Sequence, residues 1–174
     1  MTDHPQKLSS QDERLFAGLS HITILLPFIG ILGPAIIWAT QKERSEYVKF
    51  HALQAVFYQL SLILVGLTGF ICYFLSFFVS FGGMFLGMFS MPLAAAVGEG
   101  ENPLVMVIAF LVSALPVAIP FAVLGLMLLS GLVFLVYGVI GAINAMQGNA
   151  FAYPFIGKRV RAFLAEEDNK AVTE

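Results

Sequence analysis

The sequence predicts an all-α protein: a polytopic transmembrane helical bundle of three to four spans, with broken helices and a C-terminal interfacial amphipathic helix. Composition is the first observation behind this prediction. Of the 174 residues, 59% are hydrophobic and 11% are charged, against about 25% charged in an average soluble domain. The second observation is that residues 50–98 and 102–157 contain no Lys, Arg, Asp or Glu. About 18 uncharged apolar residues are enough for a span, so both tracts are expected in lipid.

The N-terminal part, residues 1–14, is predicted to be a polar tail that ends in a helix cap. Ser10 and Glu13 have the spacing of a capping box. In this motif the hydroxyl and the carboxylate each accept a hydrogen bond from a backbone N–H that the helix leaves unpaired. A helix should therefore begin near Gln11.

The first apolar segment, residues 15–40, is long enough for one crossing and too short for two. Pro27 and Pro34 each remove a helical hydrogen bond, and Gly30 and Gly33 weaken the same stretch. We expect a kinked or broken helix here.

The second apolar segment follows a charged loop at residues 41–49 and should run from residue 50 to residue 81. Gly82 and Gly83 are expected to interrupt it. The piece after them, residues 84–97, is short for a span and typical of an interfacial or re-entrant segment. Gly83 and Gly87 have the small-xxx-small spacing that lets two helices approach closely, so both are candidates for helix packing.

The last apolar tract, residues 104–147, would form a helix of about 66 Å, twice the thickness of a bilayer core. Asn102-Pro103 suits its start, as an N-cap followed by proline at the first helical position. Pro116 and Pro120 are expected to divide the tract. Either two short spans form a tight hairpin, or a membrane-edge helix precedes one full span from about residue 121. We favour the second arrangement.

Gly148-Asn149 should end this span, and Tyr153 stands where an interfacial aromatic residue is expected. The transmembrane helical domain is thus predicted to cover residues 15–154. In the C-terminal segment, residues 155–174, apolar side chains share one helical face and charged side chains occupy the others. This pattern predicts an amphipathic helix on the membrane surface, whose apolar face consists of Ile156, Val160, Phe163 and Leu164.

Lys and Arg are concentrated in the loop at residues 41–49 and in the C-terminal segment, whereas the turn at residues 98–101 is acidic. Because basic loops tend to stay in the cytoplasm, we expect a multi-pass protein of the cell (inner) membrane with both basic segments on the cytoplasmic side. The side of the N-terminus stays open: a single crossing by the first segment would place it outside, whereas Lys7 and Arg14 favour the inside.

A polar stripe enters the membrane at the start of the second apolar segment, where four polar residues at spacings of 4, 3 and 4 share one helix face. One interpretation is a hydrated vestibule, or a site that handles protons or a substrate. We favour interhelical hydrogen bonding and interfacial anchoring, because no charged residue accompanies the stripe. The stripe comprises Tyr47, His51, Gln54 and Tyr58; Asn144 and Gln147 from the last span are expected to meet it, and Ser20 and His21 to join from a different depth.

The other motifs point to no chemistry. Met84, Met88 and Met91 share a helical face and could bind Cu(I), but thioethers in a segment rich in Phe and Gly are typical packing residues. The single cysteine permits no intrachain disulfide or multi-cysteine metal site. The sequence contains no catalytic constellation, and its few basic residues alternate with acidic ones, which disfavours nucleic acid as a partner. We therefore predict no enzyme, no metal and no cofactor.

Three stretches, in order along the chain, carry a family resemblance. Residues 10–38 contain a Glu-Arg-Leu start, a Ser-His pair and a Gly-Pro-x-Ile-x-Trp ending; residues 47–55 read YVKFHALQA, and residues 142–154 end in Tyr-Pro. These stretches resemble a bacterial Tic-twenty-like membrane protein family, similar to a component of the chloroplast inner-envelope translocon. The resemblance implies a four-span helical channel subunit with the aromatic-basic motif and both termini on the stromal side.

The expected function is that of a non-enzymatic structural or interaction subunit of a membrane complex. The alternative is a channel or carrier, protein- or solute-conducting, which the resemblance to the plastid import component suggests. The expected partners are the lipid bilayer and either other membrane proteins or further copies of the chain.

Overall fold

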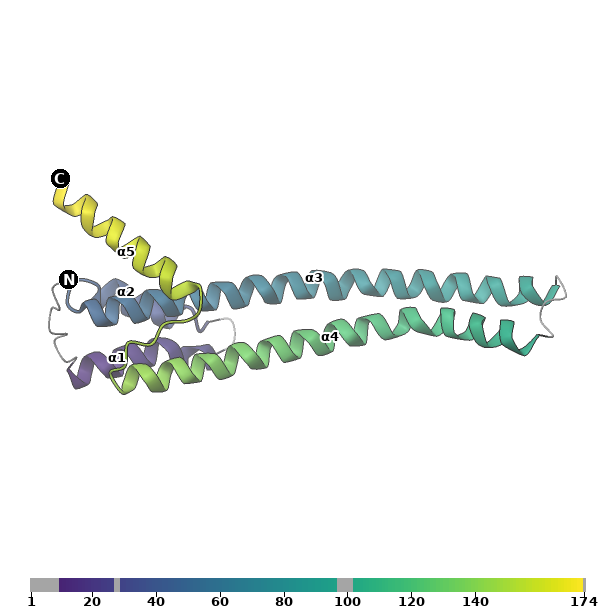
Figure 1. Ribbon diagram of the computed structural model, residues 1–174, viewed down its shortest axis with the longest axis horizontal. Coiled ribbons are helices and arrows are strands. Elements are labelled where there is room, and N and C mark those ends of the chain that lie inside the picture. Colours follow the sequence, from purple (N-terminus) through teal and green to yellow (C-terminus); the bar gives the residue numbers. More distant parts are fainter. Residues whose placement is uncertain (1–9, 27–28, 97–101, 174) are drawn as a thin grey trace. The chain divides into compact units, whose positions relative to one another are not determined.

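The computed structural model describes residues 10–26, 29–96 and 102–173, and every regular element within these ranges is helical, as predicted. Residues 1–63 and 132–174 form one compact unit, and residues 64–131 form another. We call them the first and second units; α3 and α4 contribute to both. In chain order the elements are α1 (Gln11–Ile22), the 3₁₀ helix η1 (Thr23–Leu25), α2 (Leu32–Gln41), α3 (Glu46–Ala96), α4 (Pro103–Met146) and α5 (Ile156–Thr173) (Figure 1).

The capping box at the start of α1 is confirmed. The Ser10 backbone N–H donates to Glu13 Oε2 at 2.6 Å, and the Glu13 N–H donates to Ser10 Oγ at 3.3 Å. Both bonds pair backbone groups that the first helical turn leaves unsatisfied. The sequence signal at the N-terminus of this helix was therefore sufficient to place it.

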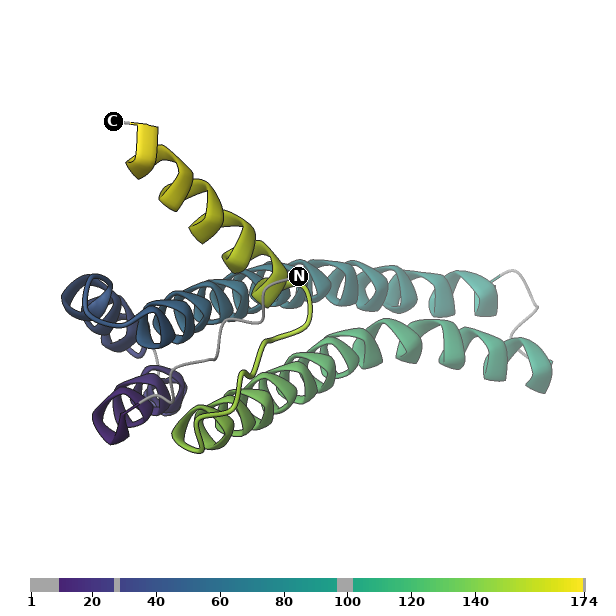
Figure 2. The same cartoon turned by 60° about the vertical axis from the view of Figure 1, so that its left-hand side comes forward.

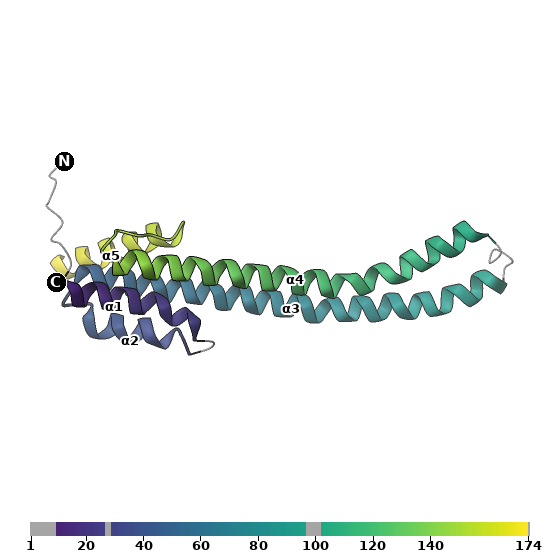
Figure 3. The same ribbon diagram turned by 90° about the horizontal axis from the view of Figure 1, so that it is seen from below.

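The first apolar segment is broken, as its prolines and glycines predict, but it does not form one crossing helix. α1 ends at Ile22, and α2 lies beside it (Figure 3). At 1.5 Å per residue these helices are about 18 Å and about 15 Å long, and neither could cross a core of about 30 Å. Pro34 lies in the first turn of α2, where its missing N–H leaves no hydrogen bond unmade.

α3 is continuous, so the predicted interruption at Gly82-Gly83 is wrong. A glycine inside a helix costs only about 1 kcal/mol relative to alanine, and a close helix contact offsets that cost here. A Cβ atom on Gly83 would lie 2.6 Å from Cγ of Pro116, so only glycine allows α4 to approach this closely. Residues 84–96, predicted as a separate interfacial piece, are the last part of α3; residues 97–101, which include the predicted acidic turn, lie outside the described residues.

α4 begins as the sequence predicts. Asn102 Oδ1 accepts a hydrogen bond from the Leu104 N–H at 3.0 Å, which is the N-cap contact, and Pro103 is the first helical residue. At the other end Gly148 has a positive φ of 80°. The N–H groups of Gly148 and Asn149 donate to the carbonyls of Ala145 and Asn144, each at 3.0 Å, which together make the glycine-capped helix end known as a Schellman motif.

The predicted division of α4 at its prolines is wrong, because Pro116 and Pro120 both lie inside one helix. A proline cannot donate to the carbonyl four residues before it. For Pro120 that carbonyl belongs to Pro116, and Ser80 Oγ on α3 lies 2.5 Å from its oxygen. The hydroxyl also lies 2.9 Å from the Ser76 carbonyl, but its shorter contact is to Pro116. A side-chain hydroxyl thus takes the place of the missing backbone donor, and the helix continues past the proline.

Two stretches of helix are long and apolar enough to cross a membrane: Glu46–Phe89 in α3 and Ala114–Met146 in α4. Only 6% of the most apolar window of each is buried within the chain, unlike the core helix of a soluble domain. The described residues therefore supply two candidate spans; the larger number expected from the sequence stays a prediction.

In the first unit, α1 packs on the last turns of α4, while α2 lies beside the start of α3 (Figure 2). Two glycines allow α1 and η1 to lie close to α4. A Cβ atom on Gly18 would lie 2.3 Å from Cγ of Met146, and one on Gly138 would lie 2.8 Å from Cγ2 of Ile24. Small residues that let helix backbones approach are typical of helix packing in membranes.

α5 places three of its four predicted apolar residues against the protein. Val160 and Leu164 are buried with Leu53 of α3, and Ile156 packs against the same group, whereas Phe163 is 48% exposed. An ion pair between Lys49 Nζ and Glu167 Oε2 at 3.5 Å also links α3 to α5. The position of this helix on the membrane surface stays a prediction.

Candidate functional site

A group of buried polar side chains lies in the first unit, where α1, α3 and the segment after α4 meet. We call it the buried polar cluster; exposure of its members ranges from 0% for His51 to 8% for Tyr58. Polar groups buried in this way must be paired with each other, because their loss of water is otherwise unfavourable. Its members are His21 of α1, His51, Gln54 and Tyr58 of α3, and Tyr153 of the segment 147–155.

The two histidines and one tyrosine form a chain of hydrogen bonds. Tyr153 Oη lies 3.0 Å from His21 Nδ1, and His21 Nε2 lies 3.1 Å from His51 Nδ1. If Tyr153 donates to His21, then His21 carries its proton on Nε2 and donates to His51, whose own proton must be on Nε2. In the reverse order His51 donates to His21, and His21 donates to the tyrosine oxygen. The tyrosine O–H then has no acceptor, so the first order pairs more groups.

This series of hydrogen bonds ends at His51 Nε2, which is buried and has no hydrogen-bond partner among the described residues. The ring of Tyr47 lies beside the imidazole, with a centroid separation of 4.5 Å. An unpaired buried N–H costs about 1–3 kcal/mol. His51 therefore carries an energetic cost at the far end of the chain.

Gln54 fixes the segment that follows α4. Its Oε1 accepts a hydrogen bond from the Tyr153 N–H at 3.2 Å, and its Nε2 donates to the Phe151 carbonyl at 3.4 Å. One side chain thus serves two backbone groups two residues apart, as a neighbouring strand would. A Cβ atom on Gly157 would lie 2.9 Å from Gln54 Oε1, so glycine there leaves room for the amide.

The tyrosines of the stripe join α3 to α4. The ring of Tyr58 stacks on that of Tyr153 with centroids 3.9 Å apart, and its hydroxyl donates to the Phe134 carbonyl at 2.9 Å. The Tyr47 hydroxyl donates to the Ala145 carbonyl at 2.8 Å, which lies in the last turn of α4. The Ala145 carbonyl also accepts from the Gly148 N–H, so Tyr47 adds a second hydrogen bond at the C-terminal end of α4.

The two residues expected from α4 pair elsewhere. Asn144 Nδ2 donates to the Ile140 carbonyl of its own helix at 2.8 Å, and Gln147 Oε1 accepts from Asn149 Nδ2 at 3.1 Å. The stripe instead meets backbone groups of α4 and of residues 151–153. Of the pair expected from the first segment, His21 joins the cluster, whereas the Ser20 hydroxyl donates to Ala17 of its own helix.

Sequence reasoning missed two members of this polar network. Tyr153, interpreted as an interfacial anchor, is only 2% exposed and lies inside the first unit. Gln59 is also buried, and its Nε2 donates to Thr23 Oγ1 at 3.0 Å. The spacing of the stripe could not reveal Gln59, because it directly follows Tyr58 and so lies on a different helix face.

The chemistry open to this cluster is hydrogen bonding between helices. Two helices and the segment 147–155 supply its members, and none of them is an acid, a lysine or an arginine. Within the described ranges, no group of three or more His, Cys, Asp or Glu side chains could hold a metal ion. Both interpretations of the stripe, interhelical hydrogen bonding and a hydrated vestibule, stay predictions.

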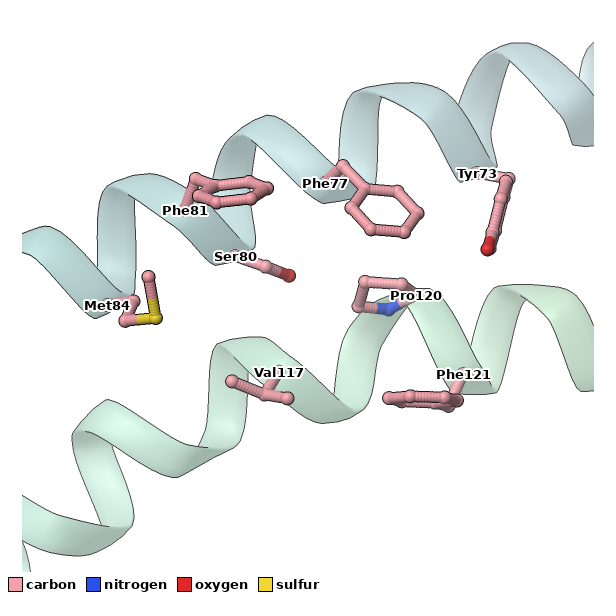
Figure 4. A pocket seen from close by; sticks show the side chains of 8 residues that line it. All are labelled: Tyr73, Phe77, Ser80, Phe81, Met84, Val117, Pro120 and Phe121. Carbon is pink, nitrogen blue, oxygen red and sulfur yellow. The ribbon is translucent and has the colours of Figure 1, made fainter.

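The second unit contains a cavity of about 260 Å³ between α3 and α4. Figure 4 shows side chains from the two helices facing each other across it, with Ser80 and the Tyr73 hydroxyl as polar groups. Met84 lies on its wall, while Met88 is 63% exposed; the side chain of Met91 is outside the described part. The lining residues are Tyr73, Phe77, Ser80, Phe81, Met84, Val117, Pro120 and Phe121.

Of the two glycines predicted to pack helices, the structure shows a contact for one. Gly83 contacts Pro116, as described above. For Gly87 the structure gives its place in α3, and its role in packing stays a prediction.

Comparison with known proteins gives one family. The model of the magnetosome magnetite crystal formation protein family (MamF/MmsF) matches residues 12–160. No curated protein and no solved structure matches the chain. The family match overturns the Tic-twenty-like assignment. That resemblance rested on short motifs in residues 10–38, 47–55 and 142–154.

Proposed function

The chain belongs to the magnetosome magnetite crystal formation protein family, and from this premise we propose that it is a non-enzymatic subunit of the magnetosome membrane. In this proposal it contributes to magnetite crystal formation by packing with other membrane proteins or with further copies of itself. The family match does not support the channel that the plastid resemblance suggested.

The observation that carries the membrane part of the proposal is apolar surface left uncovered by the chain. Along α3 and α4 large apolar side chains point away from the protein, and the most apolar windows are only 6% buried. Soluble monomers rarely expose contiguous apolar patches beyond a few hundred Å². These apolar side chains are therefore expected to contact lipid or the helices of partner proteins. Examples are Leu64 (65% exposed), Phe78 (60%), Leu126 (68%) and Leu128 (67%).

The non-enzymatic part rests on how the polar side chains are used. Tyr47, Gln54 and Tyr58 each bond to a backbone group of the chain itself. Side chains committed in this way hold helices in place and are not arranged around a substrate. We therefore assign the stripe and the buried polar cluster to the stability of the first unit.

The start of α5 supports a membrane-surface position for this helix, through a face that differs from the one predicted. Phe155 precedes the first residue of α5 and is 84% exposed, which is unfavourable for an aromatic ring in water. Lys158 and Arg159, in the first turn of α5, are exposed as well. An aromatic side chain beside basic ones suits the interface of an anionic membrane, which agrees with a cytoplasmic C-terminus.

The experiment is removal of the gene from a magnetite-forming bacterium, followed by complementation. Crystal length and shape are measured by electron microscopy in the deletion strain and after return of the wild-type gene. We expect smaller or misshapen crystals in the deletion strain and restored crystals on complementation. Crystals indistinguishable from those of the parent strain in all cases would refute the role in crystal formation.

The packing part of the proposal has a separate test. The full chain is purified in mild detergent, and its mass is measured by light scattering. We expect an oligomer or co-purifying membrane proteins. A monomer without any partner would contradict action through helix packing and would leave the crystal phenotype to be explained in another way.

A further inference from the structure

We propose that the cavity of the second unit binds one chain of a membrane lipid, with a carbonyl oxygen of the lipid accepting a hydrogen bond from the Tyr73 hydroxyl. This site is independent of the buried polar cluster and goes beyond the proposed function. It rests on the composition of the cavity walls, on the medium around the helices and on the Tyr73 hydroxyl, which has no hydrogen-bond partner among the described residues.

The walls of the cavity are apolar, and they lie in the two candidate spans. Tyr73, Phe77 and Met84 belong to the stretch Glu46–Phe89, and Val117 belongs to Ala114–Met146. Hydrocarbon surrounds such helices, and water enters a cavity only where several polar groups can hold it. The occupant should therefore be apolar along most of its length.

The prolines help to maintain the cavity at one end. Pro116 contacts Gly83, since a Cβ atom on this glycine would lie 2.6 Å from Pro116 Cγ. The Ser80 hydroxyl lies 2.5 Å from the Pro116 carbonyl. These two contacts join α3 to α4 beside the cavity, and the hydroxyl of Ser80 is already used, so it offers little to a ligand.

Tyr73 differs from Ser80, because no hydrogen bond from its hydroxyl is found among the described residues. Figure 4 shows the hydroxyl directed from α3 toward α4, beside Pro120 and Phe121. A hydroxyl without a partner is unfavourable in hydrocarbon. A ligand with an apolar chain and a carbonyl oxygen would fill the apolar space and pair this group, and membrane lipids combine both features.

The cavity is accessible from the side of the helices. Several residues on its walls are also substantially exposed at the surface of the chain, among them Phe81 (58%), Val117 (45%) and Phe121 (71%). A lipid chain can therefore enter laterally from the bilayer. An entrance from water is not needed.

The test uses the full chain in phospholipid nanodiscs that contain a phospholipid with a photoreactive diazirine on one acyl chain. After irradiation, mass spectrometry locates the cross-links. We expect them to be concentrated on the cavity residues, and Val117→Phe, which fills the space, to abolish this concentration. Val133→Phe makes the same substitution at a position of α4 that is 51% exposed and should change nothing. Cross-links spread evenly over the exposed faces of both helices would overturn the proposal.

The role of Tyr73 is tested with Tyr73→Phe, which retains the ring and removes the hydroxyl. Lipid retained through detergent exchange, counted by native mass spectrometry, should fall roughly two- to tenfold, the factor that one net hydrogen bond supplies. Unchanged retention would refute the hydrogen bond. Since this variant preserves the packing, it decides the point even if Val117→Phe fails to fold.

Discussion

His21 on α1 and His51 on α3 meet inside the first unit, with Nε2 of the first 3.1 Å from Nδ1 of the second. Tyr153 completes the chain on the other nitrogen of His21 at 3.0 Å. Three parts of the sequence that are far apart are thereby joined through imidazole rings. Because both histidines are buried, each depends on the other for a hydrogen bond that water cannot supply.

Removal of both histidines should therefore harm the protein less than the effects of the two single removals added together. His51→Leu leaves the His21 donor unpaired, at a cost of about 1–3 kcal/mol in the free energy of unfolding. The double variant His21→Phe/His51→Leu should be less destabilised than the sum of the two single variants, with a coupling of about 0.5–3 kcal/mol. Denaturant unfolding in detergent micelles measures all three, with Gln147→Leu as an exposed control. Additive effects would contradict the hydrogen bond.

The contact between Ser80 and the Pro116 carbonyl gives a second prediction. Ser80→Ala leaves the carbonyl unpaired and should destabilise the protein by about 1 kcal/mol. In the background Pro120→Ala the helix regains the N–H that reaches this carbonyl, so the same Ser80 substitution should have little effect there. Thermal unfolding of the four proteins makes the comparison. Ser61→Ala is the control, since Ser61 bonds within its own helix. An equal cost in both backgrounds would disprove the compensation.

Gly148 should tolerate no side chain. Its φ of 80° is unfavourable for other residues, and a Cβ atom would lie 2.9 Å from Arg14 Nε. Gly148→Ala is expected to lower the free energy of unfolding by about 1–2 kcal/mol. Gly131→Ala is the matched control, because it meets open space inside α4 and should be neutral or stabilising. Equal effects of the two substitutions would show that the Schellman motif is unimportant.

Gln54 should control access to the segment after α4. Gln54→Leu removes both hydrogen bonds to residues 151 and 153, and we expect chymotrypsin to cleave there at least several times faster than in the wild type. Cleavage is followed by mass spectrometry of the fragments. Gln41→Leu on α2 provides a control substitution of the same type. If cleavage at residues 151–155 is unaffected, Gln54 does not hold the segment.

Helix type and helix starts could be predicted from the sequence because the signals are local. The capping box at Ser10 and the N-cap at Asn102 each depend on residues within one helical turn, and both appear in the structure. The polar stripe was found for the same reason, since Tyr47, His51 and Gln54 share one face by spacing alone. Local patterns in this chain therefore predict where helices begin and which residues share a helix face.

The partners of those faces could not be predicted, because they depend on contacts between distant residues. Glycines and prolines were interpreted as helix breakers in α3 and α4, yet Gly83, Pro116 and Ser80 compensate one another across the two helices. Tyr153 likewise carries an interfacial pattern, but the reversal at Gly148 directs the following segment into the first unit. Tertiary contacts outweighed local propensity at each of these positions.

Extraction of a cell lysate with alkaline carbonate tests the central claim most directly, because it removes peripheral proteins from membranes and leaves integral ones in place. If the exposed apolar faces of α3 and α4 are held by hydrocarbon, the chain should remain in the membrane pellet and need detergent for release. Recovery of the chain in the supernatant as a monodisperse protein without detergent would contradict the account.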